Sequence, residues 1–257
     1  MKLGFIGTGK IAGAIVTGLC TSNIKELIIN LSPRNEEKSK NLAKIYSNVY
    51  RMESNQFVLD NSDTVFISVL PDVSKDILSA LKFKETHTVI SLVPLLKFSE
   101  LTEVVKPATK ISRAVPLHTV AHHNCPIPVF NANKTVLELF SHIGQPFKVD
   151  NEDQLHVLWA STGFIGHYFK FLKVLSDWAV SRGAGETDVG MYFADMFYSL
   201  ALSARQTERI DLEELVKHAS TPSGLNEQAI REIDEKGIYE AYKSAADNLL
   251  ERFKIDL

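Results

Sequence analysis

The sequence has little cysteine, no long hydrophobic run and no excess of positive charge. Its two cysteines, Cys20 and Cys125, form no CxxC pair, so we interpret both as reduced thiols of a cytoplasmic protein. No uncharged apolar stretch reaches the roughly 18 residues of a membrane span, which argues against a membrane protein. The first predicted strand begins at residue 3, so we expect no signal peptide before it. The net charge of -3 argues against nucleic acid as a partner, because phosphates attract basic surfaces.

The chain of 257 residues is long enough for two modest domains. Up to about residue 150, short apolar segments alternate with helical patterns, which predicts an α/β domain with a doubly wound parallel (Rossmann) sheet. The predicted strands are 3–6, 27–31, 64–70, 88–93, 110–115, 126–130 and 146–149. Residues 151–257 instead show helical patterns over 155–182, 186–206, 212–219 and 226–253. We therefore expect a dinucleotide-binding domain at 1–150 and an all-α substrate and dimerisation domain at 151–257.

A glycine-rich turn follows the first predicted strand, with the pattern Gly7-x-Gly9-x-x-Ala12 before a helix. Gly7 permits a tight turn, Gly9 lets a pyrophosphate approach the backbone, and the free N–H groups of the helix attract phosphate. This pattern predicts a dinucleotide site that includes residues Gly7, Thr8, Gly9, Lys10 and Ile11.

The end of the second strand carries no acidic residue and has Ser32 and Arg34 instead. Enzymes that use NAD usually place Asp or Glu here, where it accepts a hydrogen bond from the ribose 2′-hydroxyl. A hydroxyl and a guanidinium are suited to a 2′-phosphate, which an acid would repel. The sequence therefore predicts NADP (NADPH) as cofactor.

The order of these motifs resembles the pyrroline-5-carboxylate reductase family over the whole chain. Ser68-Val69-Leu70-Pro71-Asp72 resembles the family's turn beside the nicotinamide, and Asn55 matches an asparagine that contacts the cofactor. The resemblance thus adds Asn55, Val69, Leu70 and Pro71 to the cofactor site. Arg113-Ala114-Val115-Pro116 resembles another strand end of the family. The resemblance to this family implies NADPH-dependent reduction of a cyclic imino acid, as in the reduction of 1-pyrroline-5-carboxylate to L-proline. It also implies a homodimer or larger homo-oligomer.

The substrate half departs more from the family. Thr221-Pro222-Ser223-Gly224 resembles the loop that holds the substrate carboxylate, but Leu225 and Asn226 stand where the family has threonines. We expect Thr221, Ser223, Gly224, Leu225 and Asn226 to bind substrate. Asn226 and Thr221 are the candidate catalytic residues, with Asn226 in place of a threonine hydroxyl on the imine nitrogen. The same residues also suit ordinary helix capping.

Two other functions stay open. Lys170 lies a few residues beyond Gly166, loosely as in the related 3-hydroxy acid dehydrogenases, where such a lysine is the acid/base. The altered substrate motifs also fit a cofactor-binding protein that has lost catalysis. His118, His122 and His123 lie between prolines without a cysteine or carboxylate cluster, so we predict no metal site. The many apolar residues of the helical part predict burial against a second subunit.

Overall fold

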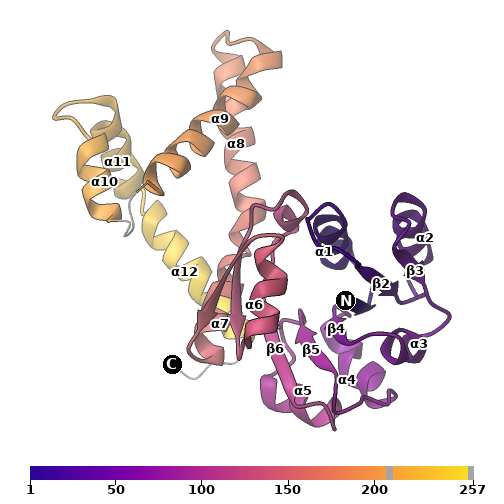
Figure 1. The fold of residues 1–257 in the computed structure, drawn as a ribbon. Helices are drawn as coiled ribbons and strands as arrows, with labels where there is room; N and C mark the ends of the chain where they lie inside the picture. The colour runs from indigo at the N-terminus through magenta and orange to yellow at the C-terminus, as the bar shows by residue number, and fades with distance from the viewer. Residues whose placement is uncertain (207–210, 254–257) are drawn as a thin grey trace. The chain divides into compact units, whose positions relative to one another are not determined.

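The computed structural model describes residues 1–206 and 211–253, which divide into two compact units (Figure 1). The first contains Met1–Ala160 together with residues 250–253, and the second contains Ser161–Leu249. We expected a boundary between residues 150 and 151, whereas the first unit extends to Ala160. The reason is that helix α7 (Glu152–Ser161) buries Leu155 and Ala160 in the first unit. Residues 254–257 of the expected second domain lie outside the described residues.

The first unit is built on one eight-stranded sheet with the order β3-β2-β1-β4-β5-β6-β7-β8. Strands β1 to β6 pair in parallel, in the order expected for a doubly wound dinucleotide fold. The central strands are apolar on both sides, because helices cover both faces of such a sheet. The strands are β1 Lys2–Ile6, β2 Ile28–Leu31, β3 Val49–Arg51, β4 Thr64–Ile67, β5 Thr88–Ser91, β6 Lys110–Ala114, β7 Pro126–Phe130 and β8 Gln145–Val149.

Two strands differ from the sequence-based expectation. The short strand β3 at the edge of the sheet was not predicted. Strand β7 runs antiparallel to β6, although it pairs in parallel with β8. The connection from β6 to β7 contains only the 3₁₀ helix η1 (His118–His122), whereas a parallel return needs a crossover of a dozen or more residues.

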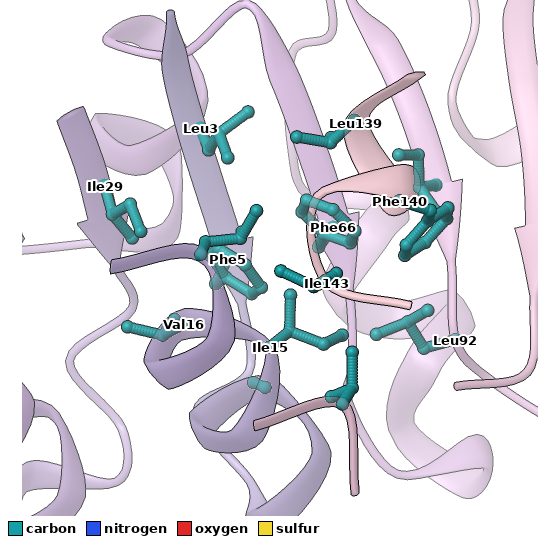
Figure 2. Packing of buried hydrophobic residues seen from close by; sticks show 14 of the residues in the cluster. Leu3, Phe5, Ile15, Val16, Ile29, Phe66, Leu92, Leu139, Phe140 and Ile143 are labelled. Atoms are coloured by element: carbon teal, nitrogen blue, oxygen red, sulfur yellow. The ribbon is translucent and has the colours of Figure 1, made fainter. Parts of the chain in front are cut away.

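Successive residues of the strands point to opposite faces and fill two separate cores. Phe5 and Phe66 stack in the first core with ring centroids 4.6 Å apart, and Phe140 meets Phe66 edge-on, as Figure 2 shows. Val65 and Ile67, the neighbours of Phe66 along β4, belong to the second core. The sheet is thus the central layer between two groups of helices, and its strand ends remain free to build a site.

Helices α2, α3 and α6 of the first unit begin at side-chain caps. Asn35 accepts a hydrogen bond from the Lys38 N–H at the start of α2, and Asn133 accepts one from Val136 at the start of α6. The helices are α1 Lys10–Cys20, α2 Glu36–Ile45, α3 Asn55–Asp60, α4 Pro71–Ser79, α5 Phe98–Val104, α6 Lys134–Ser141 and α7 Glu152–Ser161.

The second unit consists of helices α8 to α12. Their bounds are α8 Phe164–Ser181, α9 Glu186–Ala204, α10 Leu212–Ala219, α11 Leu225–Glu235 and α12 Ile238–Leu250, followed in the first unit by the 3₁₀ helix η2 Glu251–Phe253. Two of the predicted helical patterns each contain more than one helix. The pattern over 155–182 breaks at residues 162–163, and the pattern over 226–253 breaks at Gly237, whose φ of +68° does not continue a helix.

Helices α8 to α11 contain no buried residue, although they are rich in apolar side chains. The same holds for α12. Trp178 is 58% exposed and Met191 is 67% exposed, which is unusual for such large side chains. The other large exposed side chains of these helices include Tyr168, Phe169, Tyr192, Tyr198, Leu200, Leu212 and Val216. An apolar surface of this extent indicates an interaction surface.

Candidate functional site

The turn after β1 has the geometry that the glycine pattern predicts. Gly7 adopts φ +97°, and a Cβ there would lie 2.5 Å from the carbonyl oxygen of Ser68. Gly9 is the N-cap of α1, and no atom lies within 4 Å of the place where its Cβ would be. The first N–H groups of α1 have no partner within the helix, so the open space above Gly9 is suited to a phosphate.

A groove of about 690 Å³ crosses the carboxyl ends of four neighbouring strands, β2, β1, β4 and β5. It brings together most of the predicted cofactor residues from three separate parts of the chain. The lining residues are Gly7, Thr8, Gly9, Lys10, Ile11, Ala12, Arg34, Asn35, Glu36, Glu37, Ser68, Val69, Leu70 and Leu92. Leu92 and the residues after Arg34 were not predicted. Their position directly beyond a strand end is the signal that could have found them.

Ser32 makes a contact within the protein that the sequence did not predict. Its side chain is only 1% exposed, and its hydroxyl oxygen accepts a hydrogen bond from the Gly7 N–H at 2.9 Å. The Thr8 hydroxyl lies 3.2 Å from the same oxygen. Ser32 therefore holds the glycine turn against β2, and its contact with a 2′-phosphate stays a prediction.

Two further predicted cofactor residues, Asn55 and Pro71, lie outside the groove lining. Asn55 is the first residue of α3, and Pro71 is the first residue of α4. Pro71 fixes the start of α4 directly after Val69 and Leu70, which do line the groove. Both residues keep their cofactor role as predictions.

The end of the groove near β2 contains charges of both signs. Glu36 pairs with Lys40 at 2.7 Å and lies 4.0 Å from Arg51, and the Lys40 contact above all lowers the pKa of Glu36. Arg34 is exposed, and in ranges 1–206 and 211–253 no carboxylate oxygen lies within 4.0 Å of its guanidinium. Lys40 and Arg51 thus offset the charge of Glu36, while Arg34 stays available for an anion.

The predicted substrate loop lies in the second unit and turns at Ser223, which has φ +59°. The Ser223 N–H donates to Oε2 of Glu227 at 2.7 Å, and the Asn226 side-chain amide donates to the Ala219 carbonyl oxygen at 2.7 Å. Leu225 is 85% exposed. Glu227 was missed by the sequence analysis. Its signal was an acid at the third position of α11, where capping carboxylates occur.

Gly224 and Thr221 lie against each other at the start of α11. The Gly224 N–H donates to the Thr221 carbonyl oxygen at 2.9 Å. A Cβ on Gly224 would lie 2.3 Å from the Thr221 hydroxyl oxygen and 2.9 Å from its carbonyl oxygen. Only glycine fits this loop, but its tightness serves a helix cap and an anion site equally well.

Of the three histidines in the β6–β7 connection, His123 makes hydrogen bonds with α1 and the residue that follows it. His118 and His122 lie in η1, and Nε2 of His123 lies 2.9 Å from the Gly18 carbonyl oxygen and 3.0 Å from the Thr21 hydroxyl. Within the described ranges, no three His, Cys, Asp or Glu side chains form a group that could hold a metal ion. The described helices also include none long and apolar enough to span a bilayer.

Models of known protein families match both the N-terminal and the C-terminal part of the chain. Residues 2–94 match the family model described as NADP oxidoreductase coenzyme F420-dependent. Residues 152–255 match the model described as pyrroline-5-carboxylate reductase dimerisation. These two matches, with the relatives and solved structures below, support the pyrroline-5-carboxylate reductase family. The resemblance predicted from the sequence is confirmed.

Relatives of this family match along nearly the whole chain. The pyrroline-5-carboxylate reductase of Methanosarcina acetivorans is 28% identical over 268 residues, covering 98% of this chain and 97% of the relative. The enzyme of Corynebacterium melassecola is 24% identical over 266 residues, covering 96% and 95%.

Solved structures of the family share the fold. The 1-pyrroline-5-carboxylate reductase of Streptococcus pyogenes has a TM-score of 0.86 and 19% identity, and the match covers 99% of both chains. The Plasmodium falciparum pyrroline carboxylate reductase with NADP bound has a TM-score of 0.85 and 18% identity, covering 99% of this chain and 97% of that one. These similarities support the predicted fold class, a parallel-sheet dinucleotide unit followed by helices.

Proposed function

We propose that this chain reduces 1-pyrroline-5-carboxylate or a closely related cyclic imino acid with NADPH. The observation that carries the proposal is the groove across β2, β1, β4 and β5, which has an open phosphate position at Gly9 and a free Arg34 at its β2 end. The two relatives named above match over 96% and 98% of this chain, and the Plasmodium structure holds NADP. Together these support an NADP-dependent oxidoreductase that acts on a C=N bond.

The residues of the groove divide the work of cofactor binding. The free N–H groups at the start of α1 hold the pyrophosphate, and the Arg34 guanidinium binds the 2′-phosphate. Val69, Leu70 and Leu92 form an apolar wall at the β4 and β5 end, which keeps water from the nicotinamide. When bound, NADPH supplies the hydride for the reaction.

The substrate side needs a site for a carboxylate and a site for the imine nitrogen. Thr221, Ser223, Gly224 and Leu225 hold the carboxylate in this proposal, and Asn226 and Thr221 contact the imine. A carboxylate that accepts from the Ser223 N–H has to displace Glu227, which accepts from it in the structure. A cyclic imine protonated in solution accepts hydride without a strong protein acid, so the lack of an Asp–His pair is compatible with catalysis.

The active assembly is a homodimer or larger homo-oligomer in this proposal. The match to a dimerisation model over residues 152–255 and the exposed apolar side chains of α8 to α12 support it. We also propose a cytoplasmic protein, on the two cysteines that form no disulfide.

A substrate panel tests the function directly. The purified protein is mixed with NADPH or NADH and with 1-pyrroline-5-carboxylate or its six-membered homologue, and separately with NADP and a series of 3-hydroxy acids. We expect cofactor oxidation with the cyclic imino acids and NADPH. Turnover of 3-hydroxy acids would instead support the dehydrogenase with Lys170 as acid/base. Binding of NADPH without any turnover would support a protein that has lost catalysis.

A further inference from the structure

Arg113, at the end of β6, is the largest side chain that the first unit buries completely. Two donors of its guanidinium serve two parts of the chain. Nη2 donates to the carbonyl oxygens of Val93 at 3.0 Å and Pro94 at 2.6 Å. Nη1 donates to Oε1 of Glu152 and to Nε2 of His156, which lies 2.8 Å away. A buried charge persists only with such partners, so this arrangement is closely fixed.

Helix α7 contributes the other groups around this arginine. Arginine only donates hydrogen bonds, so Nε2 of His156 accepts and the ring is neutral. Burial, and then the nearby Arg113 charge, lower the pKa of His156, which agrees with this assignment. Trp159 lies under the guanidinium with 5.1 Å between Arg113 Cζ and the ring centroid. Glu152 also accepts from the Phe98 N–H at 2.6 Å, at the start of α5.

This cluster fixes a segment that the sheet itself does not hold. The ladder with β4 continues to Leu92, whose N–H donates to the Ile67 carbonyl oxygen at 2.8 Å. The chain then leaves the sheet, and Arg113 is the donor to the next two carbonyl oxygens. Val93 is fully buried, and a buried carbonyl group needs such a partner. Leu92, directly before this anchor, lines the groove.

We infer that Arg113 is a positioning residue that sets the β5 end of the cofactor groove through the carbonyls of Val93 and Pro94. The inference rests on the proposed function, which puts the pyrophosphate at α1 and Arg34 on the 2′-phosphate. The nicotinamide then extends toward the ends of β4 and β5, where Leu92 forms the wall. Arg113 touches neither cofactor nor substrate in this arrangement, and acts through the backbone that it anchors.

The decisive variant is Arg113→Lys, which keeps the charge but not the planar fork. A single ammonium nitrogen cannot replace Nη1 and Nη2 at their separate partners. Glu152→Gln weakens the same anchor from α7 and serves as a second variant that keeps an acceptor for Phe98. Lys110→Met, at the exposed start of β6, is the matched control. Three quantities are measured: the NADPH dissociation constant by fluorescence, the single-turnover rate of hydride transfer, and amide hydrogen exchange.

For Arg113→Lys, we expect hydride transfer to slow by about 10-fold or more, because small misplacements of reacting groups are costly. The NADPH dissociation constant should change less than about 3-fold, since the phosphate contacts are untouched. Exchange at the Phe98 amide should accelerate, while the segment from Leu3 to Ala12 keeps its protection. Glu152→Gln should change rate and exchange in the same direction by less, and Lys110→Met should change neither.

An unchanged rate in folded Arg113→Lys would overturn the inference. A dissociation constant that rises in step with the loss of rate would also overturn it, because that pattern indicates general damage to the unit. If the wild-type protein reduces no cyclic imino acid, the proposed function fails by itself. Exchange at Phe98 then decides the positioning role, and unchanged exchange in Arg113→Lys rejects it.

Discussion

Arg34 is the exposed cation at the β2 end of the groove, and Glu36 in the same segment is offset by Lys40 and Arg51. We expect Arg34→Ala to weaken NADPH binding by about 1.5–3 kcal/mol, the range for a lost hydrogen bond to a charged group. NADH lacks the 2′-phosphate, so its affinity should change little. Fluorescence titration with both cofactors measures the difference, and Lys38→Ala in α2, the helix that follows Arg34, is the control. An equal loss for both cofactors would contradict the role of Arg34.

Gly224 and Lys170 separate the two enzyme readings. A valine side chain at Gly224 would meet the Thr221 carbonyl oxygen, so Gly224→Val should abolish imine reduction while NADPH still binds. Lys170 is exposed on α8, and an iminium substrate needs no lysine. Lys170→Met should therefore leave imine reduction largely intact, whereas a hydroxy-acid dehydrogenase would lose on the order of 10²–10⁴-fold. The steady-state rates of both variants with a cyclic imino acid and NADPH decide between the two assignments. A dead Lys170 variant with an active Gly224 variant would show the opposite assignment.

At the scale of one helix, Glu227 is an acid at the start of α11 that holds the Ser223 N–H. Removing its charge should ease the approach of a substrate carboxylate. We expect Glu227→Gln to lower KM for the imino acid by about 5-fold, corresponding to about 1 kcal/mol between exposed charges, with kcat unchanged. The helix should lose a few tenths of a kcal/mol in stability, because an acid favours its N-terminus. Glu232→Gln in the same helix is the control, and a raised KM in Glu227→Gln would contradict the prediction.

The sequence predicted elements well where the signal is local. The glycine turn, the apolar central strands and the missing acid after β2 are each contained in a few consecutive residues, and they located most of the groove. The burial of Ser32 under the Gly7 turn could not be predicted in this way, because it depends on pairing between β1 and β2. The anchoring role of Arg113 depends on residues 93–94 and 152–159, which only the folded chain brings together. The helix breaks at residues 162–163 and 237 each contain a glycine. The pattern alone does not distinguish such a glycine from one that a continuous helix tolerates.

At the scale of the whole molecule, the apolar side chains of the second unit call for a partner. Helices α8 to α12 bury no residue within one chain, and residues 152–255 match a dimerisation model. We expect sedimentation equilibrium at micromolar concentration to give a dimer or larger assembly. Met191→Glu on α9 should weaken it, because a charge would be buried in an apolar interface. Glu138→Lys on α6 is a control outside that unit, and a purely monomeric wild-type protein would refute the assembly.

Gly7 is held from both sides by hydrogen bonds within the protein. Its N–H donates to Ser32 and its carbonyl oxygen accepts from Ser68 at 2.5 Å, so two hydroxyls from neighbouring strand ends fix the turn. A loop already in its final shape loses little conformational entropy when it receives a ligand. Encounter with NADPH should therefore be a single step. In stopped-flow experiments the observed rate should rise linearly with cofactor concentration and show no slow second phase. Ser32→Ala together with Ser68→Ala should introduce one.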